Sequence, residues 1–322
     1  MSRVIGIDVG GTKIAATVLG PEGMGEHTQQ PTRLGSAEEL IDQLVGVVGE
    51  AAAGQAFDAV GLGVPSIVRF ETGEIAASTN IPLQGVPLRR VLGERLGVPV
   101  FVDNDATVAA LAEAYDEDLK LVSRNLVIIT VGTGIGGGVV INGQIFRGGS
   151  GGAGEIGMTM IGLLCEPEPL AASEHFPQPG SFEALSAGHA LDRFAQAAAD
   201  AHPDSALGRL AASGQKVLGA DAVTAARAGD EPAAAAVRRW AHALGVGIAN
   251  TINTFDPDEV VIGGGATAAG ALLLDQAIAF AEGFVHPGLQ GRARVRLARW
   301  GPTAGVLGAA LLAVHELEQA AT

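Results

Sequence analysis

The glycines of this chain gather in short clusters, and most of the clusters come directly after a run of apolar, β-branched residues. Glycine accounts for 47 of the 322 residues, roughly twice its usual share. The clusters lie at 10–11, 132–138, 148–154 and 263–265. In a glycine-rich turn, successive backbone N–H groups converge on one point, and such a turn suits an anion. For any single loop, the alternative is an ordinary hairpin turn.

Strand-like and helix-like segments alternate from one end of the chain to the other. The residue patterns predict strands at 4–8, 14–19, 59–64, 98–102, 126–131, 138–141 and 259–262. They predict helices at 37–53, 106–115, 183–201, 206–213, 220–228, 231–255, 269–282 and 304–318. This alternation is typical of an α/β fold.

Two segments, 4–19 and 126–141, repeat one pattern of strand, glycine turn and strand. The repeat predicts two related α/β halves, and a length of 322 residues fits two domains. We expect a small N-terminal domain of residues 1–118, joined by the C-terminal helix within 304–322, and a large domain of residues 119–303. The acidic stretch 116–121 is the expected crossing between them.

The net charge of the chain disfavours two classes of partner, nucleic acids and membranes. Lys and Arg number 20 and Asp and Glu number 35, which leaves a formal net charge of −15. Such a charge repels phosphate backbones and anionic lipids, so neither nucleic acid nor a membrane is an expected partner. The first residues do not form a signal peptide, and the longest apolar run, 304–314, is far shorter than a membrane helix of roughly 20 residues. We expect a cytoplasmic protein, in keeping with its single cysteine, Cys165.

The second glycine cluster matches a dinucleotide fingerprint only in part. Gly132, Gly134 and Gly137 satisfy G-x-G-x-x-G, but that motif requires a helix directly afterwards, and residues 138–141 read as a strand. A Walker A loop is absent from the sequence, because Gly-Lys-Ser/Thr occurs nowhere in it. What remains is a pair of phosphate-binding hairpins, one per half, facing each other across a cleft.

Asp8 ends the first strand, just before the glycine turn. A carboxylate at this place can hold Mg²⁺, directly or through water, since Mg²⁺ keeps most of its waters when bound. The alternative is an Asx-type turn residue. Lys13 either offsets phosphate charge or is an ordinary surface cation.

Eight motifs, taken together and in order, resemble the ROK family of repressors, open reading frames and sugar kinases. They are DVGGTK at 8–13, GVPSIV at 63–68, STNIPLQGVPL at 78–88, DNDATVAALAE at 103–113, TVGTGIGGG at 130–138, GGAGEIG at 151–157, FEALSAG at 182–188 and VIGGG at 261–265. The resemblance implies the two-domain, actin-like (ribonuclease H-like) fold with an interdomain cleft. It also implies an ATP-dependent sugar kinase that uses Mg²⁺.

The resemblance assigns residues to both substrates. On the nucleotide side it implies Asp8 as the residue that holds Mg²⁺ through water, and a set of loop residues for the phosphates and adenosine: Gly10, Gly11, Thr12, Lys13, Gly132, Thr133, Gly134, Gly136, Gly264 and Gly265. On the sugar side it implies Gly63, Asn80, Asn104, Asp105, Glu155 and Glu183, with Asp105 as the general base that faces the attacking hydroxyl.

Each acidic residue of the acceptor side also has a plainer interpretation. Asp105 is suited to be the N-cap of the helix that follows it. Glu155 reads equally as a solvated loop carboxylate, and Glu183 as a favourable charge at a helix N-terminus. The catalytic interpretation agrees with phosphoryl transfer, in which a carboxylate accepts the hydroxyl proton while positioning and charge stabilisation do most of the work.

One part of the family pattern is missing. Zinc-bearing members have a histidine after GEIG and a cysteine-rich loop, whereas this chain has Met158 there and only Cys165 and His175 in the loop. A structural zinc needs four ligands, so we predict no zinc site. The loop 159–181, with four prolines, must then be ordered by packing, by a subunit partner or by substrate. His175 either replaces the missing sugar contact or is a surface histidine.

The predicted activity is therefore phosphorylation of a hexose, with glucose at its 6-hydroxyl as the default acceptor. Mannose, fructose, an amino sugar or an N-acyl sugar such as N-acetylmannosamine stays open, as does polyphosphate as donor. The resemblance implies a homodimer or homotetramer. Family regulators carry a DNA-binding extension before the first phosphate motif, which here begins at Asp8, so a regulator is disfavoured. A sugar-binding protein without turnover is disfavoured by the intact Asp8 and Asp105.

Overall fold

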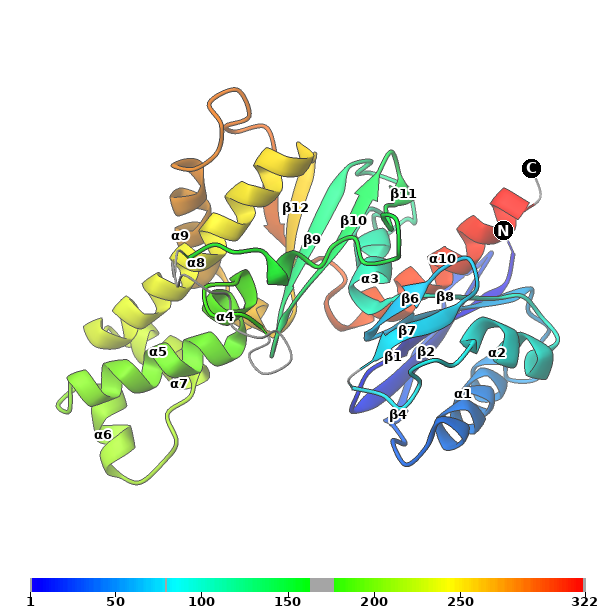
Figure 1. The fold of residues 1–322 in the computed structure, drawn as a ribbon, viewed down its shortest axis with the longest axis horizontal. Coiled ribbons are helices and arrows are strands. Elements are labelled where there is room, and N and C mark those ends of the chain that lie inside the picture. Colours follow the sequence, from blue (N-terminus) through cyan, green and yellow to red (C-terminus); the bar gives the residue numbers. More distant parts are fainter. Residues whose placement is uncertain (1, 79, 163–176, 321–322) are drawn as a thin grey trace. The chain divides into compact units, whose positions relative to one another are not determined.

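The structure, a computed structural model, describes residues 2–78, 80–162 and 177–320 (Figure 1). It divides into two compact units. The first comprises Met1–Ile128, Gly138–Gly154 and Arg299–Thr322, and the second Ile129–Gly137 and Glu155–Ala298. The predicted domains, 1–118 with 304–322 and 119–303, remain a prediction. None of the helices in the described ranges combines the length and the apolar character needed to cross a membrane.

The first unit is built on a six-stranded sheet in the order β3-β2-β1-β5-β8, with β4 also paired to β2. Its strands are β1 (Val4–Val9), β2 (Lys13–Gly20), β3 (Gly23–Met24), β4 (Thr28–Pro31), β5 (Ala59–Val64) and β8 (Val100–Asn104). β1 and β2 form an antiparallel hairpin, whereas β1, β5 and β8 run parallel. A separate antiparallel pair consists of β6 (Ser66–Arg69) and β7 (Glu74–Ser78).

The register of the parallel strands aligns their carboxyl ends. Asp8 of β1 pairs with Gly63 of β5, and Gly63 pairs in turn with Asp103 of β8. In open α/β sheets, ligands bind outside the carboxyl ends of the strands. The sheet therefore places Asp8, Gly63 and the residues that follow Asp103 along one edge of the first unit.

Two helices cover one face of this sheet. α1 (Ala37–Ala52) begins at the N-cap Ser36, whose hydroxyl accepts a hydrogen bond from the N–H of Glu39 at 3.1 Å. Its buried face recurs at helical spacing and packs, with α2 (Leu88–Leu96), against apolar side chains of β1, β5 and β8. Burial of this face holds α1 and α2 on the sheet.

The opposite face is covered by α10 (Ala304–Ala320) and α3 (Asp105–Glu113), and Figure 1 shows α10 across the sheet from α1. α10 consists largely of Ala, Gly, Leu and Val, and its small residues let its backbone touch the strands. A Cβ on Gly6 would collide with the carbonyl of Val306, and one on Gly61 with the carbonyl of Ala309. Glycine is therefore required in β1 and β5 for this helix to pack.

The second sheet has the order β11-β10-β9-β12-β13. Its strands are β9 (Leu126–Val131), β10 (Ile135–Ile141), β11 (Gln144–Ile145), β12 (Glu259–Gly263) and β13 (Arg294–Leu297). β9 and β10 form the predicted second strand–turn–strand unit, although β10 begins three residues before the expected 138. The turn between them is therefore 132–134, and Gly136 lies in a strand.

The second unit is mostly helical outside its strands. Its helices are α4 (Phe182–Ser186), α5 (Gly188–Ala201), α6 (Ala206–Ala212), α7 (Gly219–Arg227), α8 (Glu231–Phe255) and α9 (Ala271–Glu282), with short 3₁₀ turns at Ile156–Met158 and Gly265–Ala269. Apolar side chains of α5, α8 and α9 pack against β9 and β12 to make its core. The prediction of a helix over 231–255 is confirmed residue for residue.

The predicted single helix 183–201 is wrong, because the chain breaks at Ala187, whose backbone is extended (φ −71°, ψ 170°). The groups on either side make tertiary hydrogen bonds instead of helical ones. The N–H of Gly188 donates to the carbonyl of Gly132 at 2.7 Å, and the carbonyl of Ser186 accepts from the Trp240 indole at 2.7 Å. Helix propensity favours Ala187 in a helix, but these bonds need the break.

Glu113, the last residue of α3, ties the chain before α10 to α3. Its side chain is fully buried, and its two carboxylate oxygens accept hydrogen bonds from the backbone N–H groups of Arg299 (3.0 Å) and Trp300 (2.9 Å). The carbonyl of Tyr115 accepts two more bonds from the side chains of the same two residues. One carboxylate thus satisfies two backbone donors of the segment that leads into α10.

We expect Glu113→Ala to lower the thermal unfolding midpoint by a few degrees, because two backbone N–H groups lose their acceptor. Thermal unfolding followed by circular dichroism measures the change. Glu117→Ala is the matched control, since it removes the same charge from an exposed position four residues away. Equal midpoints for the two variants would contradict the anchoring role of Glu113.

Candidate functional site

The turn between β1 and β2 is held in place by backbone and hydroxyl bonds. The N–H of Gly10 donates to the carbonyl of Lys13 at 2.8 Å, and the hydroxyl of Thr32 donates to the carbonyl of Gly10 at 2.7 Å. The carbonyl of Thr12 accepts from the N–H of Thr32. A Cβ on Gly11 would lie 3.4 Å from the carbonyl of Asn80, so two predicted site residues, Gly11 and Asn80, are neighbours in the first unit.

Asp8 lies beside this turn against α10. A Cβ on Gly305 would lie 2.5 Å from both the Asp8 Cγ and its Oδ2, so the helix backbone closes over one side of the carboxylate. Burial raises the pKa of Asp8, and the nearby charge of Lys13 opposes that rise. A desolvated carboxylate with a raised pKa gains from a nearby cation. A single carboxylate also fits Mg²⁺, which is bound by one or two carboxylates together with phosphate oxygens and water.

Three polar residues in a row join β8 to α3, and the structure gives them different roles. Asp103 is buried, and its Oδ2 accepts from the Nε of Arg147 at 2.7 Å. Asn104 is the N-cap: its Oδ1 accepts from the N–H groups of Ala106 (2.9 Å) and Thr107 (3.1 Å). The interpretation of Asp105 as the N-cap is therefore wrong. Asp105 is the first residue of the helix, half-buried at its N-terminus.

Gly63 allows α3 to start close to β5. A Cβ there would lie 2.6 Å from a methyl group of Val108 and 3.5 Å from the Cα of Asp105. Gly63 and Asp105, two residues predicted for the acceptor site, are therefore in contact. Asn104 adds a bond from its Nδ2 to the carbonyl of Ser66 at 3.3 Å, which fixes the β8–α3 junction to the chain after β5.

In the second unit, Glu183 lies on the glycine turn between β9 and β10. Its Oε2 accepts from the N–H of Ile135 at 2.7 Å, and a Cβ on Gly134 would lie 2.5 Å from that oxygen. The cap of α4 is Ser181, whose hydroxyl accepts from the N–H of Ala184. Partial desolvation raises the pKa of Glu155, and the charge of Glu183 raises it further. The two predicted carboxylates are thus electrostatically coupled.

Glycine segments from three parts of the sequence meet in this unit. The carbonyl of Gly132 accepts from the N–H of Gly188, and a Cβ on Gly188 would lie 2.8 Å from the same oxygen. Gly264 has a positive φ of 78°, and a Cβ there would lie 2.5 Å from the carbonyl of Val131. The predicted loops at 132–134 and 264–265 are therefore brought together, with the end of FEALSAG between them.

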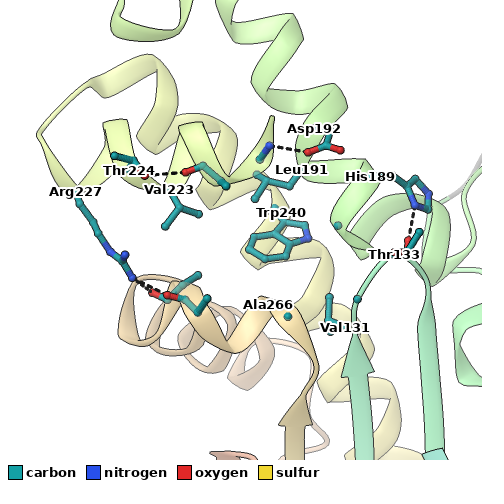
Figure 2. A pocket seen from close by; sticks show the side chains of 17 residues that line it. Val131, Thr133, His189, Leu191, Asp192, Val223, Thr224, Arg227, Trp240 and Ala266 are labelled. Atoms are coloured by element: carbon teal, nitrogen blue, oxygen red, sulfur yellow. Dashed lines mark hydrogen bonds between the residues drawn. The ribbon is translucent and has the colours of Figure 1, made fainter. Parts of the chain in front are cut away.

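A cavity of about 640 Å³ lies where these segments meet (Figure 2). It is lined by Val131, Gly132, Thr133, Gly188, His189, Leu191, Asp192, Gly219, Ala220, Val223, Thr224, Arg227, Trp240, Gly265, Ala266, Ala268 and Ala269. Its volume falls within the usual range for ligand pockets, about 300–1,000 Å³. Among the predicted site residues, Gly132, Thr133 and Gly265 line it.

Three polar side chains of this cavity, those of His189, Asp192 and Arg227, were missed by the sequence analysis. Figure 2 shows His189, whose ring Nδ1 bonds the carbonyl of Thr133 at 2.6 Å, and Asp192, whose Oδ1 accepts from the N–H of Gly219 at 2.6 Å. Arg227 donates to the carbonyls of Ala268 and Ala269. His189 and Asp192 follow FEALSAG by one and four residues. Residues three apart lie on the same face of a helix, and this spacing was the sequence signal that could have found them. No sequence signal marked Arg227.

The zinc prediction falls partly on residues outside the described ranges, namely Cys165 and His175. Met158 ends the 3₁₀ turn Ile156–Met158. Within 2–78, 80–162 and 177–320, no group of three or more His, Cys, Asp or Glu side chains is placed to hold a metal ion. The absence of zinc from this protein remains a prediction.

We expect Asp8→Asn to raise the thermal stability of the protein without nucleotide or metal at neutral pH, because the amide carries no charge to desolvate. Because the folded pKa of Asp8 lies above its ordinary value of 3.8, stability is lost as pH rises through that pKa. The difference in unfolding midpoint between Asp8→Asn and the parent should therefore become smaller as pH falls from about 8 to about 4. Thermal unfolding across that range measures it.

Asp118→Asn serves as the control, since it removes the same charge from an exposed carboxylate paired with Lys120. Its midpoint should follow that of the parent at every pH. A pH-independent gap for Asp8→Asn, or a loss of stability at neutral pH, would contradict the burial of the Asp8 charge.

Comparisons with known proteins cover almost the whole chain. The ROK family pattern matches residues 4–316. The glucokinase of Streptomyces coelicolor is 34% identical over 320 residues, which are 97% of this chain and 98% of that protein. A crystal structure of a ROK family glucokinase from Streptomyces griseus, in complex with glucose and AMPPNP, matches with a TM-score of 0.77 at 31% identity, covering 97% of this chain and 99% of the other.

A ROK hexokinase structure from Thermus thermophilus matches with the same TM-score of 0.77 at 34% identity, covering 98% of this chain and 99% of the other. These similarities confirm the predicted α/β, actin-like fold, and they run along the full set of motifs from the first glycine turn to α10. The chain belongs to the ROK family, among its sugar kinases.

Proposed function

We propose that this protein transfers the γ-phosphoryl group of ATP to a hexose, with glucose and its 6-hydroxyl as the default acceptor. The cavity beside Gly132, Thr133 and Gly265 is the observation that carries the proposal. It is large enough for a nucleoside, and it opens at a turn whose backbone N–H groups suit phosphate. The glucose and AMPPNP of the Streptomyces griseus complex support the same pair of substrates.

On the nucleotide side, the adenosine occupies this cavity, with Gly265 along one wall and Gly264 preceding it in the chain. The phosphates bind the N–H groups of Thr133 and Gly134, because the N–H of Gly132 donates to the carbonyl of Gly134 at 2.9 Å. The resemblance adds Gly10, Gly11, Thr12 and Lys13 of the first unit as a second phosphate loop. Gly136 lies in β10, outside the turn, so we propose that it acts by shaping the strand.

Asp8 would hold Mg²⁺, and the ion would neutralise charge on the transferring phosphoryl group. The partly buried position of Asp8 supports this role, because desolvation raises the pKa of its carboxylate. Binding of a cation removes that penalty. Lys13 supplies a second positive charge near the same carboxylate.

On the acceptor side, Asp105 acts as general base for the attacking hydroxyl. The position of Asp105 supports this choice, because it is the half-buried first residue of α3 and lies against Gly63. The start of a helix favours an ionised carboxylate at neutral pH. The sugar hydroxyls would be held by Asn80, Asn104, Glu155 and Glu183, with Gly63 making room for the start of α3.

Several finer points belong to the same proposal. Mannose, fructose or an amino or N-acyl sugar is the alternative acceptor, since Met158 replaces the family's histidine, and polyphosphate is the alternative donor. We propose that the protein works without zinc and as a homodimer or homotetramer. A sugar-sensing protein without turnover is the alternative from another class.

The test is an ADP-release assay of the purified protein with Mg²⁺ and ATP, over hexoses, amino sugars and N-acyl sugars. Sugar-dependent ADP release, strongest for one hexose, is the expected result. Sugar binding detected by calorimetry without ADP release from any sugar would favour the sensing alternative. If sugar phosphorylation required polyphosphate and did not occur with ATP, polyphosphate would be the donor.

We expect Asp105→Asn to lower kcat by about 10²–10⁴-fold while sugar still binds, because a general base contributes about that much. Steady-state kinetics and calorimetry with the preferred sugar measure the two effects. Asp116→Asn, at a surface turn just after α3, is the control and should keep the parental kcat. A loss of less than about tenfold for Asp105→Asn would overturn the base role.

We expect Met158→His to leave the protein free of zinc but to change its sugar preference. An imidazole at this position can regain a hydrogen bond worth about 0.5–1.5 kcal/mol, or roughly two- to tenfold in apparent affinity. Elemental analysis and the specificity constants for glucose, mannose and an N-acyl hexosamine check both parts. Unchanged ratios among the three sugars would place Met158 outside the acceptor pocket, and one tightly held zinc per chain would refute the metal prediction.

A further inference from the structure

His189 and Asp192 of α5 line the cavity about one helical turn apart. Each uses one side-chain atom for a hydrogen bond to the backbone of another segment. Because the carbonyl of Thr133 can only accept, the ring of His189 donates from Nδ1. Asp192 accepts the N–H of Gly219 with Oδ1 alone. This bond orients the carboxylate and leaves its second oxygen, Oδ2, as an acceptor at the cavity wall.

The bond from His189 to Thr133 fixes the distance of Asp192 from the phosphate-binding turn. Asp192 is three residues further along α5, so it lies about 4.5 Å along the helix axis from His189. In a nucleoside triphosphate the ribose comes next after the phosphates, and the base follows. With the phosphates at the 132–134 turn, Asp192 lies at the level of the ribose.

At the far end of the cavity, the hydroxyl proton of Thr224 and one nitrogen (Nη2) of Arg227 are already bonded within the protein. Thr224 donates its hydroxyl to the carbonyl of Ala220 at 2.9 Å, and Arg227 is bonded to the carbonyls of the 265–269 turn. Val223 and Ala266 supply apolar surface beside them. Figure 2 shows Thr224, Val223 and Arg227 on the side of the cavity away from His189 and Thr133. A flat base can pack here without a specific hydrogen bond to these side chains.

We propose that Asp192 accepts a hydrogen bond from a ribose hydroxyl of the nucleotide, so that this protein selects ribonucleotides over deoxyribonucleotides and tolerates changes in the base. The proposal rests on the nucleotide role of the cavity given above. A carboxylate offers only acceptors, and among the groups of ATP the ribose hydroxyls and the 6-amino group of adenine are the donors that match it. A site built to bond a hydroxyl rejects an analogue that lacks it.

The first part of the test compares nucleotides on the intact protein. Calorimetric Kd values without sugar, and KM values with the preferred sugar, are measured for ATP, 2′-deoxy-ATP, 3′-deoxy-ATP and ITP. We expect one deoxy analogue to bind about tenfold or more weakly than ATP, the size of a charge-assisted hydrogen bond. ITP, which lacks the 6-amino group, should bind within a few-fold of ATP.

The second part assigns that difference to Asp192. In Asp192→Ala, the Kd of the deoxy analogue divided by the Kd of ATP should fall to near one, because the acceptor is gone. Asp192→Asn keeps a carbonyl for the N–H of Gly219 and should give an intermediate ratio, which separates ligand recognition from the anchoring of α7. Asp200→Asn is the control: it removes the same charge from an exposed position on α5, where Asp200 bonds Gln196, and should keep the parental ratio.

The outcomes separate this proposal from the proposed function. Sugar phosphorylation with equal affinity for ATP and both deoxy analogues, or a parental ratio in Asp192→Ala, overturns the ribose contact and leaves the kinase intact. Weak binding of ITP with normal binding of the deoxy analogues overturns it too and assigns Asp192 to the base. If the protein showed no ATP binding and no turnover, that result would contradict the proposed function itself.

Discussion

The packing of α10 on the first sheet depends on direct contact between backbones at the glycines of the two elements. A Cβ on Gly6 or Gly61 of the sheet would collide with a carbonyl of α10, and a Cβ on Gly308 of α10 would collide with the carbonyl of Val108 on α3. Dense packing of this kind tolerates no added methyl group. The same helix brings Gly305 against Asp8, so the constraint that seats α10 also sets the surroundings of the carboxylate proposed for Mg²⁺.

That carboxylate is held at a cost to stability. Burial raises the pKa of Asp8, so the folded protein without a cation keeps an acid in a place that disfavours its charge. Functional sites commonly carry such costs, and other contacts must offset them. The Glu113 bonds to the segment before α10 are one offset, because they place that helix with two backbone donors satisfied by one buried group. Stability and cation binding are thereby linked through α10.

The sequence predicted those features that depend on neighbouring residues and missed those that depend on distant ones. The apolar run of β5 and the amphipathic pattern of α8 carry their own periodicity, and both elements match the prediction. The break at Ala187 comes instead from bonds to Gly132 and Trp240, far away in the chain. For the same reason the sequence left Asp105 open as an N-cap. Only the β8–α3 geometry shows that Asn104 caps the helix.

In the second unit, the backbone forms the proposed phosphate site, and side chains beside it can select the ligand. The glycine segments at Gly132, Gly188 and Gly264 meet through main-chain bonds and close approaches, so a phosphate held there would be bound by groups that every residue type carries. Discrimination among nucleotides or sugars then has to come from side chains on the rim of this frame. Asp192 on α5 lines the cavity beside this frame, and Met158, at the end of the 3₁₀ turn after the GEIG motif, is the position proposed above for sugar preference. Changes at these two positions should alter what the protein selects while the phosphate-binding frame stays intact, because neither side chain is part of that main-chain frame.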